Sequence, residues 1–379
     1  MECFVISEPS VGIETEKIFR DKYIDGIKTQ LRKSKYKLRE VGGEDIKYIK
    51  EYFEKEEKRP VVIVVGFTYI WLNECIHRLT SASIHPLVLT SLASQHTTKI
   101  STISFDESEA MFRLCQYLGE NGIKKVAYFG YNPNMPSRCE QYKAYKESKQ
   151  IFNIADIHPY YDCYSDYGNI DKCAKVFFSR YSDYEAVICA SPECAVKIIY
   201  EMKKRNISHS NLYVAAIGSS PLCSAVTPRI TCYNFDASLC GQKAAKLYKT
   251  LVNNPEFSYI SSYITGSLNI EESTNFMPFK NLYSRPYVAN HFSANHPTYI
   301  TTGDAEIDII NRIENLICNS DKIDLDYIEL LKSGSSDKEF AEKHFISENT
   351  LNYRIKNMCK ILGVGSRKEM QEVLIEWIG

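Results

Sequence analysis

The sequence predicts an α/β protein with two lobes built on parallel sheets, followed by a small all-α domain. Two patterns predict this fold class. Over the first 275 residues, short apolar runs alternate with longer amphipathic stretches, and such alternation is typical of parallel sheets that carry helices on both faces. From residue 321 to residue 379, the apolar residues recur only at helical spacing, interrupted by short polar turns.

The composition is that of a globular chain of two or three domains. A net charge of −1 over 379 residues excludes a uniformly basic nucleic-acid coat but not a local basic patch. The 13 cysteines include no C-x-x-C pair, so we expect reduced, mostly buried thiols and a cytoplasmic location. The first residues lack a signal-peptide pattern and no stretch approaches the ~18 apolar residues of a membrane span, so no membrane association is expected.

A first series of elements runs from residue 3 to residue 130. Its clearest member is PVVIVVGF at 60–67, a continuous β-branched run that is typical of a strand buried on both faces of a parallel sheet. The other predicted elements are strands at 3–6, 36–41, 86–91, 100–105 and 124–130 and helices at 16–33, 43–57, 69–80 and 107–120.

A second, similar series begins near residue 137, so the sequence predicts two α/β halves in tandem. Its elements are helices at 138–152, 168–180, 192–204 and 237–252 and strands near 157–161 and at 185–191, 212–218 and 230–235. Sheets of this kind bind ligands at the carboxyl ends of their strands. We therefore expect residues 1–274 to form a two-lobed ligand-sensing domain.

Residues 275–320 are expected to be a linker and a connecting helix. The segment 275–303 contains three prolines and many Asn, Ser, Thr and aromatic residues. Asp304 is placed to cap a helix whose apolar stripe consists of Ile307, Ile310, Ile313 and Ile317. Two alternatives remain for this stripe: packing against the helix's own chain, or pairing with its copy in a homodimer.

Residues 321–379 predict a compact domain of short helices. A helix at 324–334 ends at Gly334, and Ser336 with Glu339 has the spacing of a capping box for the next helix. Ser347 is the expected cap of a third helix at 347–361, and a fourth follows at 367–377. Two short helices joined by a tight turn, the second with exposed polar residues, are typical of a helix-turn-helix.

The third helix carries the candidate DNA-reading face. Five Lys or Arg residues and no acidic residue lie between 350 and 368. Asn suits adenine edges, Lys suits guanine edges or phosphates, and arginines suit phosphates. The residues expected to contact double-stranded DNA are Ser347, Asn349, Thr350, Asn352, Tyr353, Arg354, Lys356, Lys360 and Arg367. The alternative is a solvated surface, since 321–379 holds nine Lys and Arg against eleven Asp and Glu.

About 45 residues of this domain resemble the LuxR/GerE-type helix-turn-helix. The matching residues are Gly334, Glu339-Phe340-Ala341, Ser347, Thr350-Leu351, Met358, Leu362-Gly363-Val364 and Ser366-Arg367. Asn352, Arg354 and Ile361 depart from that pattern. The stretch NTLNYRIKNM is also similar to the recognition helix of PucR-type regulators. Both resemblances imply DNA binding.

Residues 2–274 resemble the ligand-binding core of the LacI/GalR family, a type I periplasmic-binding-protein fold. The stretches that carry the resemblance contain Gly26, Asp106-Glu107, Arg138, Tyr142 and the closing GSLNIEEST at 266–274. In that family the residues aligned with Arg138 and Asp106 hold polar groups of the ligand, so the resemblance implies the same role here. LacI/GalR proteins carry the DNA-binding unit first, whereas here it comes last.

Two departures weaken a sugar assignment. The family's Asn-Asp pair becomes Ser191-Pro192, and its Gly-Phe-Asp-Asp becomes the segment 216–219. Apolar pockets with few placed polar groups nevertheless suit ring-shaped ligands. The residues expected to bind the effector, a sugar or a related metabolite, are Arg138, Asp106, Phe67, Tyr131, Ser191, Ser219 and Tyr233.

No catalytic, cofactor-binding or metal-binding pattern occurs in the chain, so we expect no enzyme activity, no cofactor and no metal. Together the resemblances imply a cytoplasmic, ligand-responsive transcriptional regulator that acts as a homodimer on DNA. The alternative from another class is a ligand-free dimerisation scaffold whose terminal helices bind a protein.

Overall fold

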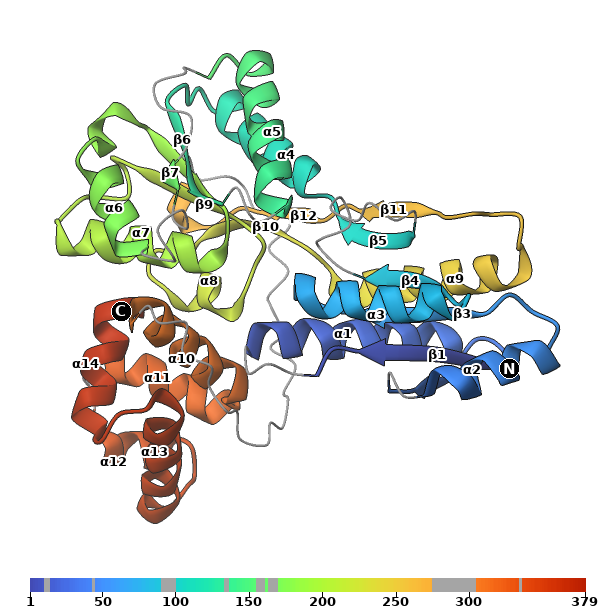
Figure 1. The fold of residues 1–379 in the computed structure, drawn as a ribbon. Helices are drawn as coiled ribbons and strands as arrows, with labels where there is room; N and C mark the ends of the chain where they lie inside the picture. The colour runs from blue at the N-terminus through green and yellow to red at the C-terminus, as the bar shows by residue number, and fades with distance from the viewer. Residues whose placement is uncertain are drawn as a thin grey trace. The chain divides into compact units, whose positions relative to one another are not determined.

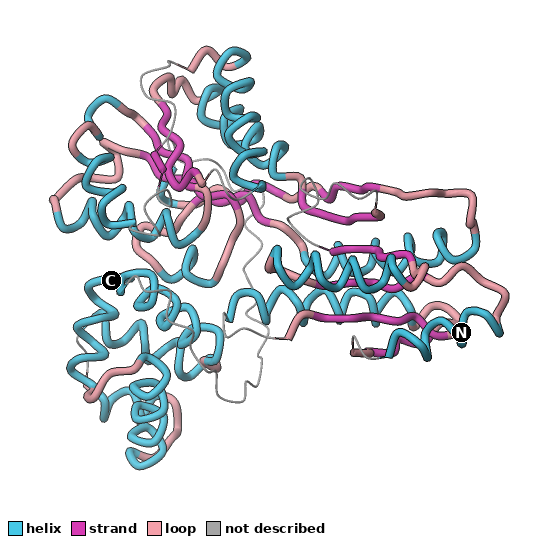
Figure 2. Tube along the Cα trace, viewed as in Figure 1, coloured by secondary structure: helices cyan, strands magenta, loops and turns pink. Residues whose placement is uncertain are grey.

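The computed structural model describes residues 1–9, 14–42, 45–89, 100–132, 136–154, 161–162, 170–274, 305–333 and 336–379 (Figures 1 and 2). The chain divides into two compact units. Unit 1 consists of residues 1–109, 134–140 and 235–267, and unit 2 consists of residues 110–133, 141–234 and 268–379. None of the helices in the described ranges combines the length and the apolar character that spanning a bilayer requires.

Unit 1 is a parallel sheet with helices on both faces. Its strands, in spatial order, are β11 (Ser261–Ile264), β5 (Ser101–Phe105), β4 (His85–Leu89), β3 (Val61–Val65), β1 (Glu2–Ser7) and β2 (Lys37–Glu40). Its helices are α1 (Glu14–Leu31), α2 (Ile46–Lys55), α3 (Tyr69–Ser81) and α9 (Ala237–Asn253). Every residue of β3 is buried, as its unbroken apolar run predicts.

Unit 2 contains the second sheet. Its strands, in spatial order, are β12 (Ser267–Asn269), β10 (Thr231–Asn234), β9 (Tyr213–Ile217), β8 (Ala186–Cys189), β6 (Val126–Tyr131) and β7 (Tyr161–Asp162). The pairs from β10 to β7 are parallel. In Figure 1, α4 (Glu107–Glu120) and α5 (Pro136–Ile151) lie on one side of this sheet, and α6 (Ile170–Phe178), α7 (Pro192–Lys204) and α8 (Pro221–Ala225) lie on the other.

The prediction of two halves in tandem is wrong in its boundary. Most of α4 and all of β6 belong to unit 2, although both precede residue 137, and α9 returns to unit 1 to pack along α1. The chain therefore crosses between the units more than once. Hydrophobic periodicity reports the type of each element, but it carries no signal for which of two similar sheets a strand joins.

The C-terminal helices share one apolar core with the second sheet. They are α10 (Ala305–Asn319), α11 (Lys322–Ser333), α12 (Asp337–Lys343), α13 (Glu348–Leu362) and α14 (Arg367–Ile378). Ile310, Ile313 and Leu316 of α10 are fully buried, and α10 contacts α13, α8, α6 and α7. The apolar stripe of this helix thus packs on its own chain, which is the first of the two predicted alternatives.

The predicted caps differ in outcome. The Ser347 hydroxyl accepts a hydrogen bond from the Thr350 amide at 3.1 Å and caps α13, as predicted. Ser336 precedes α12 but its side chain makes no capping hydrogen bond, so that half of the capping box is wrong. The linker 275–303, Asp304, Gly334 and most of the predicted strand 157–161 lie outside the described residues.

Candidate functional site

The candidate DNA-reading helix α13 is anchored along its inner face. Leu351, Ile355, Met358 and Leu362 are each buried, as their helical spacing predicts. The helix ends at Gly363, whose left-handed conformation at φ 75° suits glycine, and the amide of Gly363 bonds back to the Lys360 carbonyl. The orientation of the outer face is therefore fixed by packing and by both caps.

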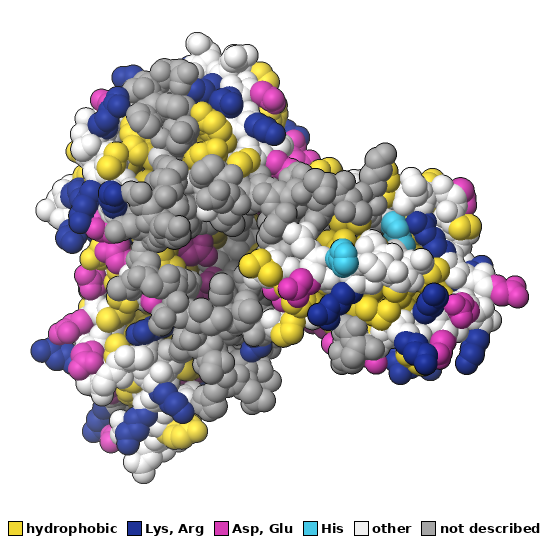
Figure 3. Space-filling model, viewed as in Figure 1, with side chains coloured by type: hydrophobic (Ala, Val, Ile, Leu, Met, Phe, Trp, Pro, Cys, Tyr) yellow, Lys and Arg dark blue, Asp and Glu magenta, His cyan; other side chains and the backbone are white. Residues whose placement is uncertain are grey.

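The outer face of α13 is polar, basic and open. The exposed residues that the sequence analysis assigned to DNA contact are Ser347, Asn349, Thr350, Asn352, Tyr353, Lys356 and Lys360, and Glu348 and Asn357 are exposed as well. On the side of the molecule seen in Figure 3, Lys and Arg side chains gather over the end of unit 2 that α12 and α13 form. Glu348, in the first turn, is the acidic residue of this helix.

The two arginines predicted to contact phosphates are engaged within the domain. Arg354 Nη1 lies 2.8 Å from Asp321 Oδ2 and 2.9 Å from Asp324 Oδ1, which ties α13 to the start of α11. Burial alone would raise the pKa of Asp321, but hydrogen bonds from the Asp324 amide and the Arg354 guanidinium lower it below its ordinary value. About a quarter of the Arg354 side chain is exposed.

Arg367 ties α14 to α12 in the same way. Its Nη2 lies 2.6 Å from Asp337 Oδ1, and its Nε donates to the Tyr327 hydroxyl at 2.9 Å. Asp337 also accepts from the Tyr327 hydroxyl at 2.8 Å. Both arginines thus have a structural function inside the domain that sequence analysis did not predict.

Phe345 is a surface feature that sequence analysis missed. It lies in the turn between α12 and α13 with a left-handed φ of 53° and is 97% exposed. A bulky aromatic residue in this conformation is strained, and Gly or Asn is the usual occupant. Together with Tyr353, which is 74% exposed, it places two aromatic rings on the surface of the turn and α13. The sequence could have indicated this feature, because Phe345 is an aromatic residue within the predicted turn HFIS.

Unit 1 carries three of the seven predicted effector residues. Phe67 lies two residues after the carboxyl end of β3, and Asp106 directly follows that of β5. The Phe67 ring stacks on Tyr23 at 6.3 Å. Asp106 Oδ1 accepts from the Glu109 amide at 2.9 Å, so it also caps α4. Arg138 lies half-buried in the first turn of α5.

Tyr263 on β11 lies near Asp106 in unit 1 and was missed because β11 itself was not predicted. It is 50% exposed. Partial burial raises the pKa of Tyr263, and the nearby charges of Glu140 and Asp106 raise it further. Its hydroxyl is therefore a protonated donor at neutral pH. Unit 1 thus carries carboxylates, a phenol and an aromatic ring among these residues.

Unit 2 carries the other four, at the carboxyl edge of its own sheet. Tyr131 ends β6, Ser191 and Ser219 follow β8 and β9, and Tyr233 lies in β10. The Ser219 hydroxyl donates to Asn234 Oδ1, and the Tyr131 ring lies 5.0 Å from that of Tyr142. Tyr233 is 2% exposed, so its ring is part of the packed interior rather than an open surface.

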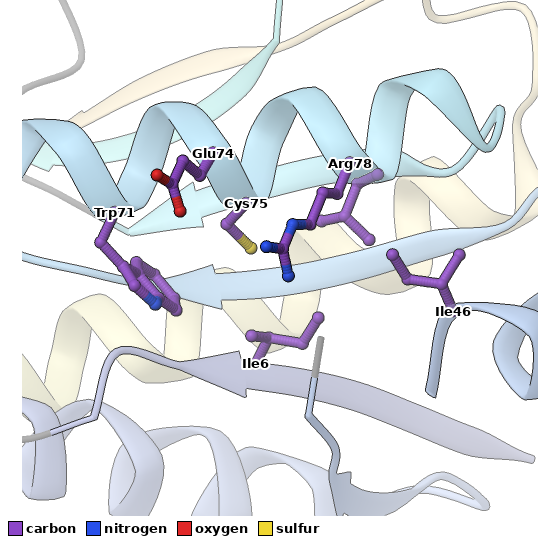
Figure 4. A pocket seen from close by; sticks show the side chains of 7 residues that line it. Ile6, Ile46, Trp71, Glu74, Cys75 and Arg78 are labelled. Carbon is purple, nitrogen blue, oxygen red and sulfur yellow. The ribbon is translucent and has the colours of Figure 1, made fainter. Parts of the chain in front are cut away.

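Figure 4 shows a small hollow elsewhere in unit 1, with a volume of about 130 Å³. It is lined by Ile6, Ile46, Trp71, Glu74, Cys75, Arg78 and Leu79. None of these is a predicted effector residue. Burial raises the pKa of the Cys75 thiol to about 11, so this cysteine is an unreactive thiol at neutral pH.

Comparison with solved structures places the fold in a known class. A LacI family transcriptional regulator from Enterococcus faecium, with bound ribose, aligns with a TM-score of 0.53 and 14% identity over 72% of this chain and 98% of its own. The transcription regulator CcpA of Lactococcus lactis aligns with a TM-score of 0.54 and 15% identity over 72% of this chain and 100% of its own. The chain therefore has the two-sheet, periplasmic-binding-protein-like fold of LacI-family regulators.

One curated relative is detected from sequence. The NTD biosynthesis operon regulator NtdR of Bacillus subtilis (strain 168) is 25% identical over 185 residues, which is 47% of this chain and 55% of the relative. The chain thus spans about half the length of the curated relative that it matches. No protein-family model matches the chain.

Proposed function

We propose that this protein is a cytoplasmic transcriptional regulator that senses a small molecule through its two-sheet core and binds DNA through its C-terminal helix-turn-helix. The observation that carries the proposal is the combination of two parts. The core has the fold of LacI-family regulators, and α13 turns Asn, Lys and Tyr side chains outward from a well-anchored inner face. NtdR, which is also named as a regulator, supports the same class.

For DNA, the exposed residues of α13 divide into two proposed roles. Asn349 and Asn352 read base edges in the major groove, Lys356 contacts a guanine edge or a phosphate, and Lys360 contacts phosphate. Ser347, Thr350 and Tyr353, near the start of α13, contact the sugar-phosphate backbone of the DNA. Arg354 and Arg367 remain in the proposed interface, where their carboxylate partners hold α13 and α14 in register for phosphate contact.

Lys356→Ala is expected to weaken binding to a generic duplex about tenfold at low salt, because it removes a base or phosphate contact of ~1.4 kcal/mol. Binding by the unchanged protein should fall steeply as salt rises, since counterions are released from the duplex. Fluorescence anisotropy with a labelled duplex measures both.

Lys47→Ala, in unit 1 and 89% exposed, is the charge-matched control and should leave the affinity unchanged. Equal affinity of the Lys356→Ala variant and the unchanged protein would move the DNA-binding face away from α13. Failure of the unchanged protein to bind any duplex at low salt would contradict DNA binding altogether.

For the effector, we propose that Arg138, Asp106, Phe67, Tyr131, Ser191, Ser219 and Tyr233 contribute to binding a sugar or a related metabolite. The bound ribose of the Enterococcus faecium structure supports the ligand class. The serine hydroxyls, the Asp106 carboxylate and the Arg138 guanidinium offer the donors and acceptors that hydroxyl-rich ligands need.

A thermal-shift screen of sugars, nucleosides and amino acids tests this assignment. A ligand that binds only the folded state at 100 times its Kd stabilises by about 2.7 kcal/mol. Arg138→Ala is expected to abolish the shift, whereas Arg113→Ala, an exposed arginine of α4, should keep it. A shift that persists in Arg138→Ala would exclude this arginine from the effector site.

The scaffold alternative has one observation in its favour, because exposed Phe345 and Tyr353 would suit a protein partner. The exposed Asn349, Asn352, Lys356 and Lys360 on the same helix favour DNA. We also propose that the regulator is a homodimer, since two helix-turn-helix units can then read two half-sites. Light scattering at micromolar concentration measures the oligomeric state.

A further inference from the structure

One helix of unit 2, α7, reaches from a predicted effector residue to the C-terminal helices. It begins directly after Ser191 and runs to Lys204. Its side chains contact both α10 and α14. A helix of 13 residues is stiff over its length of about 20 Å. A displacement at its first turn is therefore passed to its last turn.

The aromatic contact lies between Tyr200 of α7 and Trp377 of α14. Their ring centroids are 4.2 Å apart and the planes differ by 6°, so the two rings are stacked. Trp377 is 3% exposed. The Tyr200 hydroxyl donates to Glu376 Oε1 at 2.9 Å, which fixes the rotation of the ring pair. This pair joins α14 to the sensor part of unit 2.

The polar contact is a buried ion cluster around Lys197. Its ammonium is fully buried and lies 2.9 Å from Glu201 and 3.3 Å from Asp171, and it also contacts Glu306 of α10. The three carboxylates lie close enough together to hold a metal ion, but the lysine ammonium already occupies their centre. The cluster is therefore an internal salt bridge rather than a cation site. Asp171 and Glu201 of this cluster lie on α6 and α7, whereas Glu306 lies on the connecting helix α10.

A third contact lies at the end of α7, where the Lys203 ammonium donates to the carbonyl oxygen of Gly379. Three side chains of α7, at positions 197, 200 and 203, thus hold the helices that precede and end the DNA-binding domain. Their spacing of three residues places them along one side of the helix. The apolar core under them is continuous from the second sheet to α14.

We infer that α7 couples the predicted effector residue Ser191 to the DNA-binding helices. A shift of the first turn of α7, beside Ser191, is transmitted through the Tyr200–Trp377 stack and the Lys197–Glu306 ion pair. The inference rests on the proposed function and adds the path by which an effector would alter DNA binding. Ser191 is 7% exposed and its hydroxyl makes no capping bond, so a larger side chain there must displace the start of α7 rather than remove a cap.

The test uses the full chain with Trp71→Phe, which leaves Trp377 as the sole tryptophan. Ser191→Leu is expected to shift the emission and the acrylamide quenching of Trp377 and to change affinity for a generic duplex about fivefold, a coupling of ordinary size. Ser208→Leu, the same substitution at an exposed serine beyond the end of α7, should leave both unchanged. Ser191→Val serves as a smaller step if the Leu variant fails to fold.

The decisive measurement combines Ser191→Leu with Tyr200→Ala and Glu306→Gln. Glu306→Gln spares the pairs of Lys197 with Glu201 and Asp171, so the sensor lobe keeps its cluster. In this background Ser191→Leu should change both readouts much less, because two of the three contacts are removed and only the Lys203–Gly379 hydrogen bond remains. Fully additive effects, or an unaltered Trp377 in Ser191→Leu, would overturn the inference. The Trp377 readout requires no DNA, so loss of duplex binding by every variant would count against the proposed function alone.

Discussion

Gly26→Ala is expected to lower the free energy of unfolding of unit 1 by about 3 kcal/mol or to prevent its folding. A Cβ atom at Gly26 in α1 would overlap the backbone carbonyl of Ser238 in α9, and one at Gly241 would overlap that of Tyr23 in α1. The two glycines thus form a reciprocal close contact between the helices. Because the opposing atoms are backbone, no side-chain rotation can relieve the overlap.

Helix propensity acts in the opposite direction but is too small to compensate. Alanine is favoured over glycine within a helix by about 1 kcal/mol. Separating α1 from α9 exposes apolar residues that both helices bury, including Ile27 and Ala245, and burial of Ile27 alone contributes more than that difference. The steric overlap therefore outweighs helix propensity, and the substitution lowers the free energy of unfolding.

Urea unfolding followed at each tryptophan measures the effect, because Trp71 lies in unit 1 and Trp377 in unit 2. In a Trp377→Phe background the Trp71 transition should move to lower urea in Gly26→Ala. Gly365→Ala is the control, since a Cβ there meets its nearest atom, a Glu369 oxygen, at 3.5 Å. A change within 0.5 kcal/mol, the range of ordinary surface substitutions, would show that the helix crossing tolerates a methyl group.

Much of the fold could be predicted from local sequence, and the failures have a common physical cause. The continuous apolar run predicts the strand β3, and the length and helical spacing of the apolar residues at 192–204 predict the helix α7. The strands β11 and β12 do not, because SSYI and SLN are short, partly polar edge segments whose pairing comes from a neighbouring strand. The assignment of α4 and β6 to unit 2 is likewise a tertiary property.

The candidate sites show the same division. The inner and outer faces of α13 follow from helical spacing, so Asn349, Asn352, Tyr353 and Lys356 are exposed as expected, whereas Arg354 is only about a quarter exposed. The partners of Arg354 and Arg367 do not follow, since Asp321, Asp324 and Asp337 come from other helices. For the effector residues, the rule that strand ends share an edge predicted the grouping within each sheet. It could not predict that Asp106 also caps α4.

Lys197→Met is expected to lower the free energy of unfolding of unit 2 by about 3 kcal/mol at neutral pH, because removing one partner of a buried ion pair leaves its counter-charges uncompensated. Glu201 is 3% exposed and would keep only the contact with Arg205. Asp171 and Glu306 would lose their shared cation. Lys204→Met, on the same helix but exposed, is the control and should cost less than 0.5 kcal/mol.

The pH dependence of this loss identifies its electrostatic origin. Hydrogen bonds from Lys175 and then Lys197 lower the pKa of Asp171 below its ordinary value, against the opposing effect of burial. A carboxyl with a lowered folded-state pKa stabilises the fold above its unfolded pKa, and this contribution disappears as the pH falls through the folded value. The difference between the unchanged protein and Lys197→Met should therefore be largest near pH 7 and shrink below about pH 4. Urea unfolding at several pH values, followed at Trp377, measures it. A difference independent of pH would assign the loss to packing of the lysine stem rather than to its charge.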